Sequence, residues 1–229
     1  MKQKCILWDF DNTLAFRDGK WTRTLADILK KNGYSNFSEN DISPFFKKEL
    51  PWNRHEEAHD QYFEGRTWWE VANAVISRAV SAAGITDPDE NCKLTLQFRD
   101  EYLKLEAWHL FDDTIVNLKR SVESGFANIL ISNHTPELSM LAGKLGIENF
   151  FNLILSSALT GYDKPHREMF RQIYRIGAYE KYYMVGDNYN ADVLGGLRMG
   201  FTSILVRNEN LMKYEYSSKD LHGIWEFIG

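Results

Sequence analysis

The sequence is poor in cysteine, lacks long apolar runs and has no internal repeats, and each of these shortages narrows what the protein can be. Two cysteines, Cys5 and Cys92, lie far apart in a chain of 229 residues. That spacing favours buried or idle thiols in a reducing cytosol over a disulfide. No run of apolar residues is long enough to cross a bilayer, so we expect no membrane association. The absence of repeats and of low-complexity segments leaves an ordinary globular protein.

Basic residues are also in the minority. Lysine and arginine number 27 against 32 aspartates and glutamates, a net charge of −5, which argues against a protein built to bind the backbone of nucleic acids. The first apolar segment begins almost at residue 1 and leaves no room for a separate signal sequence, so we expect a cytoplasmic protein. Hydrophobic residues at 44% and aromatic residues at 14% suffice for one large domain, or for a core with a smaller domain.

The most informative stretch is residues 6–15. An apolar run, Ile6-Leu7-Trp8, ends abruptly in two carboxylates, Asp9 and Asp11. The run is typical of a buried parallel strand, and ligands bind at the carboxyl ends of such strands. Two acids one residue apart need a partner if they are buried, and a cation is the natural one. A strand followed by an acidic turn is the simpler alternative at this stage.

Residues 16–106 contain no convincing strand and predict a small all-helical domain. Apolar residues recur at helical spacing near 24–29, over 67–83 and over 89–105. Gly33 and Gly84 follow the first two of these segments, as glycine often follows a helix. Trp69 lies on the apolar face of the second segment, so we expect it to pack in a core.

From residue 107 onward, strands and helices alternate, which predicts a parallel sheet covered by helices on both faces. We therefore expect an α/β protein with a Rossmann-like core, residues 1–15 and 107–229, and a helical domain, residues 16–106. Thr135 is expected to cap a helix that begins with Pro136. The other expected strands are 127–131, 153–155, 182–185 and 203–206, and the other expected helices are 113–124, 167–176, 190–199 and 221–228.

Polar residues follow the ends of several expected strands. Taken alone, each is ordinary: Ser132 with Asn133 could be a loop, Lys164 a solvated lysine, and the Asp187 to Asp192 segment a turn and helix cap. The ends of parallel strands share one edge of the sheet, however, and there these residues would meet Asp9 and Asp11. Convergence of all of them at one edge indicates a site.

As an ordered set these motifs resemble the haloacid dehalogenase superfamily of phosphoryl-transfer enzymes. Asp9-Phe10-Asp11-Asn12-Thr13 is similar to the first family motif and Ser132-Asn133 to the second; Lys164-Pro165 is similar to the third, and Gly186-Asp187 with Asp192 to the fourth. The position of the long insertion implies the subgroup with a helical cap after the first motif. Asn12 stands where many members have glycine, but asparagine tolerates the same left-handed backbone.

The resemblance assigns a role to each motif residue. It implies that Asp9 is the nucleophile that forms an aspartyl-phosphate and that Asp11 is the general acid and base. Mg²⁺ would be held by Asp9, the backbone carbonyl of Asp11 and Asp187, with Asp192 in support. The phosphoryl oxygens would be bound by Lys164, by the Ser132 hydroxyl and by backbone N–H groups around Phe10, Asp11 and Asn133.

The resemblance leaves four functions to compare. The first is a magnesium-dependent phosphatase acting on a small phosphorylated metabolite, and the second is a phosphomutase with the same motifs. A dehalogenase is disfavoured by Asp11 and Asp187, because relatives with that activity lack an acid at the first position and need no metal. A catalytically silent binding protein is disfavoured by the intact motifs. The substrate and the oligomeric state stay open.

The helical insertion is expected to select the substrate as a mobile lid, with hinges near Phe16–Gly19 and Glu106–Leu110. His134, beside the expected phosphate pocket, is the first further residue to test. The spacing of His55 and His59 could bind metal, although no third ligand is evident nearby. The other candidates in the insertion are Arg17, Trp21, Trp52, Arg54, Arg66, Trp68 and Trp69.

Overall fold

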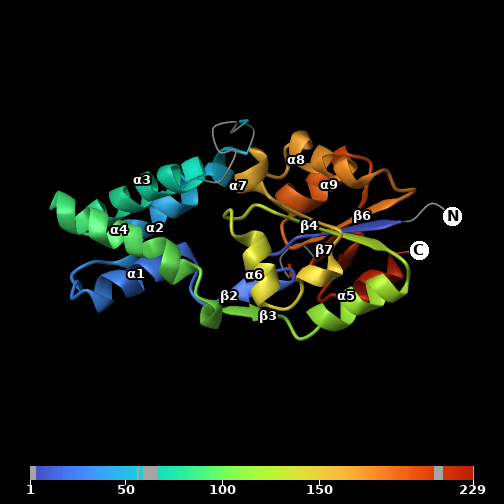
Figure 1. The fold of residues 1–229 in the computed structure, drawn as a ribbon, viewed down its shortest axis with the longest axis horizontal. Coiled ribbons are helices and arrows are strands. Elements are labelled where there is room, and N and C mark those ends of the chain that lie inside the picture. Colours follow the sequence, from blue (N-terminus) through green and yellow to red (C-terminus); the bar gives the residue numbers. More distant parts are fainter. Residues whose placement is uncertain (1–3, 56, 59–65, 209–213, 229) are drawn as a thin grey trace.

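A six-stranded parallel sheet forms the centre of the protein (Figure 1). The computed structural model describes residues 4–55, 57–58, 66–208 and 214–228. The strand order is β5-β4-β1-β6-β7-β8. The bounds are β1 Cys5–Trp8, β4 Ala127–Ser132, β5 Leu153–Ser156, β6 Tyr182–Gly186, β7 Thr202–Val206 and β8 Ser217–Ser218. The expected α/β fold is confirmed, and β8 is a short strand that the sequence pattern did not indicate.

The first strand lies in the middle of the sheet. Trp8 pairs with Leu130 of β4 on one side and with Val185 of β6 on the other. The chain adds β4 and β5 on one side of β1 and then crosses to add β6, β7 and β8 on the other. The direction of winding therefore reverses next to β1. Crevices at such reversal points, at the carboxyl ends of the strands, are where open α/β sheets bind ligands.

Helices cover both faces of the sheet, and alternate residues of β1 face opposite layers. Ile6 and Trp8 pack in the layer that includes α5 and α6, whereas Cys5 and Leu7 pack in the layer that includes α8. Burial on both faces explains why β1 is a continuous apolar run. Burial also raises the pKa of the Cys5 thiol to about 12. The bounds are α5 Thr114–Glu123, α6 Leu138–Lys144, α7 Ser157–Thr160, α8 Arg167–Arg171 and α9 Gly195–Arg198.

Four helices between β2 and β3 form a group beside the sheet, at the left of Figure 1. Aromatic rings hold them together: Trp21 of α1 stacks on Phe98 of α4 and on Trp69 of α3, and it also contacts Phe46 of α2. Helix α2 escaped the sequence analysis, although Ser38 and Asp41 form a capping box at its start. The bounds are α1 Trp21–Lys31, α2 Glu39–Lys48, α3 Arg66–Ala82 and α4 Pro88–Tyr102.

A two-stranded antiparallel ribbon joins this helical group to the sheet. Strand β2 (Ala15–Arg17) pairs with β3 (Trp108–Leu110), so the expectation of no strand within 16–106 was wrong at its first residues. Three-residue strands are too short to show an alternating pattern, and their pairing partner lies far away in the sequence. The Arg17 guanidinium reinforces the junction by donating to the backbone carbonyls of Glu101 and Tyr102 at the end of α4, at 3.0 and 2.9 Å.

Several helix boundaries differ from those expected. Thr135 caps no helix; α6 begins at Leu138, and no side chain caps it. The expected helix 167–176 is α8 followed by a 3-10 helix, Gln172–Ile176, and the expected terminal helix shrinks to one 3-10 turn, Gly223–Glu226. The expected helix 190–199 is instead a π-helix, Tyr189–Leu194, that leads into α9. None of the helices in the described ranges is both long and apolar enough to span a membrane.

Candidate active site

The structure brings the expected site residues together where β1 and β6 end. Asp9 directly follows β1, Ser132 ends β4 and Asp187 directly follows β6. Lys164 lies in the loop between α7 and α8, and Asp192 lies in the π-helix. These residues come from five separate segments, and side-chain contacts connect four of them.

Three hydrogen bonds fix the orientation of the Asp9 carboxylate. The Lys164 ammonium and the Ser132 hydroxyl donate to Oδ1 at 2.7 and 2.9 Å. The Thr13 hydroxyl donates to Oδ2 at 3.1 Å. Asp9 is only 5% exposed, and its backbone N–H donates to Val185 of β6 at 2.9 Å. The carboxylate is therefore held in one position at the end of the central strand.

Lys164 is a buried cation among acids. Its Nζ donates to Asp9 Oδ1 at 2.7 Å, to Asp192 Oδ1 at 2.6 Å and to the Ile131 carbonyl at 2.9 Å. Burial by itself lowers the pKa of this ammonium, but the Asp192 and Asp9 carboxylates outweigh burial and hold the pKa above its usual range. The Asn133 amide accepts from the Lys164 backbone N–H and donates to the Lys164 carbonyl, at 2.7 and 2.9 Å. The Asn133 side chain thus positions the lysine.

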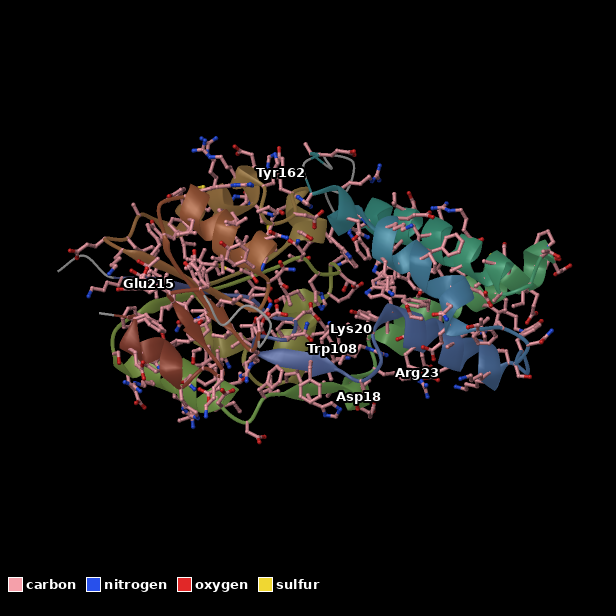
Figure 2. The ribbon with its side chains drawn as sticks, turned by 180° about the vertical axis from the view of Figure 1, so that it is seen from behind. Asp18, Lys20, Arg23, Trp108, Tyr162 and Glu215 are labelled. Atoms are coloured by element: carbon pink, nitrogen blue, oxygen red, sulfur yellow. The ribbon has the colours of Figure 1, made fainter. Side chains whose placement is uncertain are left out.

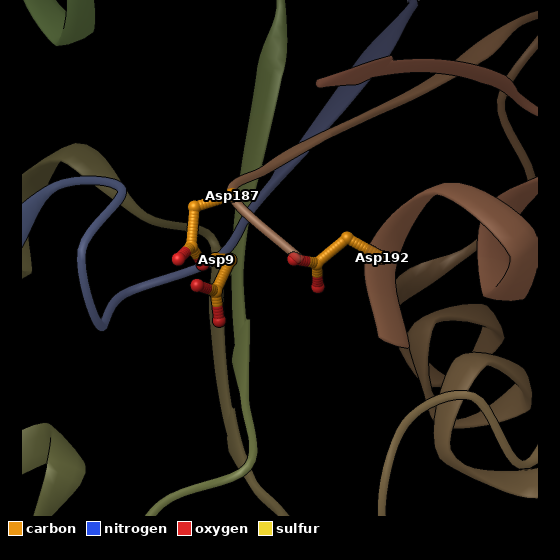
Figure 3. A group of neighbouring side chains, drawn as sticks. All are labelled: Asp9, Asp187 and Asp192. Atoms are coloured by element: carbon orange, nitrogen blue, oxygen red, sulfur yellow. The ribbon is translucent and has the colours of Figure 1, made fainter. Parts of the chain in front are cut away.

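Asp9 and Asp192, which contact this lysine, form an acidic cluster with Asp187, and Figure 3 shows the three carboxylates together. Carboxylate oxygens of Asp9, Asp187 and Asp192 all lie within 4.8 Å of one another. Burial and the neighbouring acids raise the pKa of Asp187 to about 8, and burial raises that of Asp192 to about 6 despite the opposing charge of Lys164. Three carboxylates share a single ammonium, so negative charge is in excess. Carboxylate oxygens are the ligands that Mg²⁺ prefers, and the residues present fit a divalent cation.

The backbone after β6 is shaped around this cluster. A Cβ atom at Gly186 would come within 2.1 Å of Asp192 Oδ2, so only glycine fits there. The Asn188 side chain accepts from the backbone N–H groups of Asn190 and Ala191, both at 3.0 Å. The π-helix that follows carries Asp192, whose Oδ2 accepts from the Asn188 backbone N–H at 3.0 Å. π-helical turns occur often at functional sites, and here the turn directs Asp192 toward Lys164.

The Asp11 carboxylate is not one of the three clustered acids, and the basic side chain closest to it in the described ranges is His134. His134 Nε2 is 3.9 Å from Asp11 Oδ2 and makes no hydrogen bond within the described part of the chain. The His134 ring is almost fully buried and meets Phe10 edge to face. Burial raises the pKa of Asp11, and the charge of His134 partly opposes that rise. Asn12 adopts the expected left-handed backbone, with φ of 58°, and its amide reaches Asp187 Oδ2 at 3.4 Å.

A cavity of about 430 Å³ opens above these residues, between the sheet and the helical group. Two of the expected candidates of the insertion, Trp52 and His55, line it. The Arg17 guanidinium is instead occupied by backbone carbonyls, and Arg54 forms an exposed ion pair with Glu57 at 3.5 Å. Trp21, Trp68 and Trp69 are buried by packing, as expected for Trp69. His59 and the side chain of Arg66 lie outside the described residues.

The sequence analysis missed several residues of this site. Thr13 belongs to the first motif, but its bond to Asp9 depends on the fold of the loop. Tyr102 resembled a core position of a helix, yet it also borders the cavity. Lys20 and Asn53 line the cavity too, and Lys20 had one available signal: it stands at a helix start, where serine or aspartate is usual.

Comparison with known proteins agrees with this geometry. The family model described as haloacid dehalogenase-like hydrolase matches residues 3–200, which include all four motifs. The chain belongs to this family. It is a haloacid dehalogenase-like hydrolase, and the resemblance inferred from the motifs is confirmed.

Two curated relatives match segments of different length in this chain. Haloacid dehalogenase-like hydrolase domain-containing protein 3 of Homo sapiens is 27% identical over 143 residues, which are 62% of this chain and 56% of that protein. The matched segment thus spans little more than half the length of this relative. Glyceraldehyde 3-phosphate phosphatase of Methanothermobacter thermautotrophicus is 37% identical over 68 residues, 29% of this chain and 30% of that protein.

Solved structures share the whole fold at low identity. The HAD-hydrolase YfnB of Bacillus subtilis bound to magnesium has a TM-score of 0.74 at 18% identity, covering 99% of this chain and 98% of its own. A predicted phosphoglycolate phosphatase of Haemophilus somnus has a TM-score of 0.70 at 18% identity, covering 100% and 99%. A 2-haloacid dehalogenase of Pseudomonas syringae has a TM-score of 0.68 at 18% identity, covering 100% and 98%.

Proposed function

We propose that this hydrolase is a magnesium-dependent phosphatase that cleaves a small phosphomonoester through an aspartyl-phosphate on Asp9. The observation that carries the proposal is the paired arrangement of two acids at the end of β1. Asp9 is buried and fixed by Lys164, Ser132 and Thr13, whereas Asp11 lies apart with a raised pKa. A general acid must hold a proton, which the raised pKa of Asp11 favours, and the three donors around Asp9 fix its carboxylate in one position for attack.

The first step forms the bond between an Asp9 oxygen and phosphorus and breaks the bond from phosphorus to the leaving alcohol. Asp11 gives its proton to that alcohol. Lys164 and Ser132, both within 3 Å of Asp9 Oδ1, are placed to bind the phosphoryl oxygens. Mg²⁺ held by Asp9, the Asp11 carbonyl and Asp187 would supply positive charge that offsets repulsion between the carboxylate and the phosphate.

The second step frees the enzyme. Asp11, now ionised, takes a proton from a water molecule that attacks phosphorus, and the bond to Asp9 breaks as inorganic phosphate forms. The same residue acts first as an acid and then as a base, so its proton balance closes over one cycle. Asp192 keeps Lys164 in place throughout, through its 2.6 Å bond to Nζ.

A phosphatase fits better than a dehalogenase. A halide leaves as a stable anion and needs no proton donor, so a dehalogenase would have no use for Asp11. The acidic cluster likewise has a purpose only if a cation binds there. Support also comes from the phosphatase of Methanothermobacter thermautotrophicus, the more identical of the two curated relatives over its matched segment. The dehalogenase of Pseudomonas syringae is similar in fold alone.

The cavity points to a small substrate. Its volume of about 430 Å³ is at the small end of the range for ligand sites, roughly 300–1,000 Å³. A phosphorylated metabolite fits this space, whereas a phosphoprotein or a nucleic acid does not fit beneath the helical group. A phosphomutase would use the same residues, and it differs in forming an isomer of the sugar phosphate instead of free phosphate.

The decisive experiment is phosphate release from p-nitrophenyl phosphate and a panel of phosphorylated metabolites, with wild type and Asp9→Asn. The amide is nearly isosteric but cannot attack phosphorus, so we expect turnover to fall by roughly 10³-fold or more. The exposed Asp112→Asn variant serves as a matched control and should keep full activity. An Asp9→Asn variant within about tenfold of wild type, only ~1.4 kcal/mol, would exclude Asp9 as nucleophile.

Metal removal tests the rest of the proposal. Activity should disappear with excess EDTA and return with Mg²⁺, while Ca²⁺ should inhibit because its larger coordination shell spoils the attack geometry. Full activity in EDTA after dialysis would reject the metal and call for a dehalogenase assay on a 2-haloacid.

A further inference from the structure

The cavity has two halves of different charge. The half formed by the sheet carries the acidic cluster and Lys164. The other half comes from the helical group: Lys20 at its start, Tyr102 at its end, and Trp52, Asn53 and His55 in and after the 3-10 turn Pro51–Arg54 between α2 and α3. None of these described lining residues is acidic. The leaving group of a substrate whose phosphate lies at Asp9 would therefore meet the Lys20 cation and several polar groups.

Lys20 forms no ion pair in the described part of the chain, although its charge reaches Asp11 and slightly opposes the rise in the pKa of that carboxyl. No carboxylate oxygen there lies within 4.0 Å of its Nζ. Arg23, on the same helix, shows the contrast: it pairs with Asp27 at 3.0 Å and with Glu39 at 3.5 Å. Figure 2 labels both residues, with Lys20 at the junction of the helices and the sheet and Arg23 farther along α1. Arg23 does not line the cavity.

Local structure gives no reason for a lysine at position 20. Lys20 is the N-cap of α1, and its side chain makes no capping hydrogen bond. A cation at this end of a helix is also unfavourable, because the helix dipole is positive there. Gly19, with φ of +61°, turns the chain just before Lys20. A residue that breaks a local rule beside a reaction site often serves that site.

We propose that Lys20 binds a second anionic group on the leaving-group side of the substrate. The substrate would then be a small phosphomonoester that carries a carboxylate or a second phosphate. This inference rests on the proposed phosphatase function, because Asp9 places the first phosphate. Asn53 and His55 provide polar surface around the second anion, and the Trp52 ring forms an apolar wall for a short carbon chain.

The test compares substrates that share one carbon skeleton. Glycerol 3-phosphate has a neutral leaving group, 3-phosphoglycerate adds a carboxylate, and glycerol 1,3-bisphosphate adds a second phosphate. Wild type should prefer at least one of the two anionic compounds over the neutral one in kcat/KM. The identity of the preferred compound distinguishes a carboxylate from a phosphate as the second anion.

Lys20→Gln should remove this preference. We expect KM for the preferred anionic compound to rise by roughly tenfold or more, since a charge-assisted contact is lost. Values of kcat should stay within about threefold, because the contact exists in both ground state and transition state. The neutral compound should be affected little. Lys20→Glu should go further and favour phosphoethanolamine, whose leaving group is cationic. The control, Arg23→Gln, should keep the wild-type ranking.

Two results would overturn the inference separately. If wild type hydrolyses all three glycerol compounds equally, or if Lys20→Gln keeps the wild-type ranking, Lys20 is not the specificity residue while the phosphatase function stands. If wild type releases phosphate from none of the compounds, p-nitrophenyl phosphate included, the proposed function and this inference both fail. Equal melting temperatures for wild type and Lys20→Gln would show that an altered ranking does not come from misfolding.

Discussion

At the scale of single residues, the site separates two aspartates by their surroundings. Asp9 accepts three hydrogen bonds, from Lys164, Ser132 and Thr13, which hold its carboxylate in one position. Asp11 lies two residues later, and burial raises its pKa. Within the described ranges, His134 is the one basic side chain within 4.0 Å of the Asp11 carboxylate. Under the proposed mechanism, these different surroundings suit a nucleophile at Asp9 and a proton donor at Asp11.

Asp11→Asn should slow hydrolysis most for substrates with poor leaving groups. An alkyl phosphate needs a proton on its departing oxygen, whereas p-nitrophenolate leaves without help. We expect a loss of roughly 10²-fold or more on an alkyl phosphate and a distinctly smaller loss on p-nitrophenyl phosphate. Steady-state kinetics on both substrates measures the difference. Equal losses would mean that Asp11 does not protonate the leaving group.

At the scale of elements, one glutamate ties the helical group to the sheet. Glu137 directly precedes α6, only a few residues after Ser132, and its side chain is 9% exposed. Trp69 Nε1 of α3 donates to its two oxygens at 3.0 and 3.2 Å. Arg99 of α4 donates from Nε at 2.9 Å and stacks over the Trp69 ring. Two helices thus converge on one carboxylate beside the active-site loop.

Glu137→Gln should loosen the contact between the helical group and the sheet. The amide keeps one acceptor for Trp69 but loses the charge that attracts Arg99, a change of about 1–2 kcal/mol for a contact of this kind. Backbone amide hydrogen exchange should become faster in α3 and α4, and the exchange rates in α5 should stay unchanged. Glu168→Gln breaks an exposed ion pair with Arg171 and serves as the control. Unchanged exchange in α3 and α4 would show that Glu137 does not hold them.

The expected lid hinges fall at the same junction. The segment Phe16–Gly19 includes the end of β2, and Glu106–Leu110 includes β3. Arg17 and the ribbon fasten both segments to α4, so rotation of a lid would have to occur around these contacts. The Bacillus subtilis relative is known to undergo interdomain movement. For this chain, a moving lid stays a prediction, as do the domain boundaries near residues 16 and 106.

At the scale of the whole molecule, the acidic cluster should make the stability of the metal-free protein depend on pH. The pKa of Asp187 rises from 3.8 to about 8 on folding, so the folded protein holds a proton that the unfolded chain releases. A raised pKa contributes stability below the unfolded value, and that contribution disappears as pH rises through the folded value. Without metal, the free energy of unfolding should therefore fall between about pH 4 and pH 8.

This pH dependence should respond to magnesium. We expect a slope of about 1 kcal/mol per pH unit for one proton in EDTA, and a shallower slope with Mg²⁺, which stabilises the ionised cluster. Asp187→Asn should raise the melting temperature at pH 8 in EDTA and abolish the gain from Mg²⁺. Urea denaturation at several pH values measures both effects. Equal stability of wild type and Asp187→Asn in EDTA at pH 8 would contradict the conclusion that the acidic cluster carries excess negative charge.

The sequence alone determined the fold class and which residues meet at the candidate site. Buried strands show themselves as short apolar runs, and residues after such strands must meet at one edge of a parallel sheet. An apolar run is visible locally in the sequence, and the geometry of a parallel sheet then fixes where the residues after it lie. Asp9, Ser132, Lys164 and Asp187 could be brought together on this basis, and Asn12 could be expected to adopt a left-handed backbone.

Only the tertiary structure decided what depends on contacts between distant segments. Three features depend on such contacts and follow from no local sequence pattern. They are the pairing of β2 with β3, the π-helix that carries Asp192, and the hydrogen bond from Trp69 to Glu137. Arg17 resembled a substrate ligand until backbone carbonyls were found around it. Lys20 joined the site for the opposite reason, because folding brings it to the cavity and gives it no ion pair among the described residues. The sequence specifies which residues are charged, but only the folded structure decides which groups lie next to each charge.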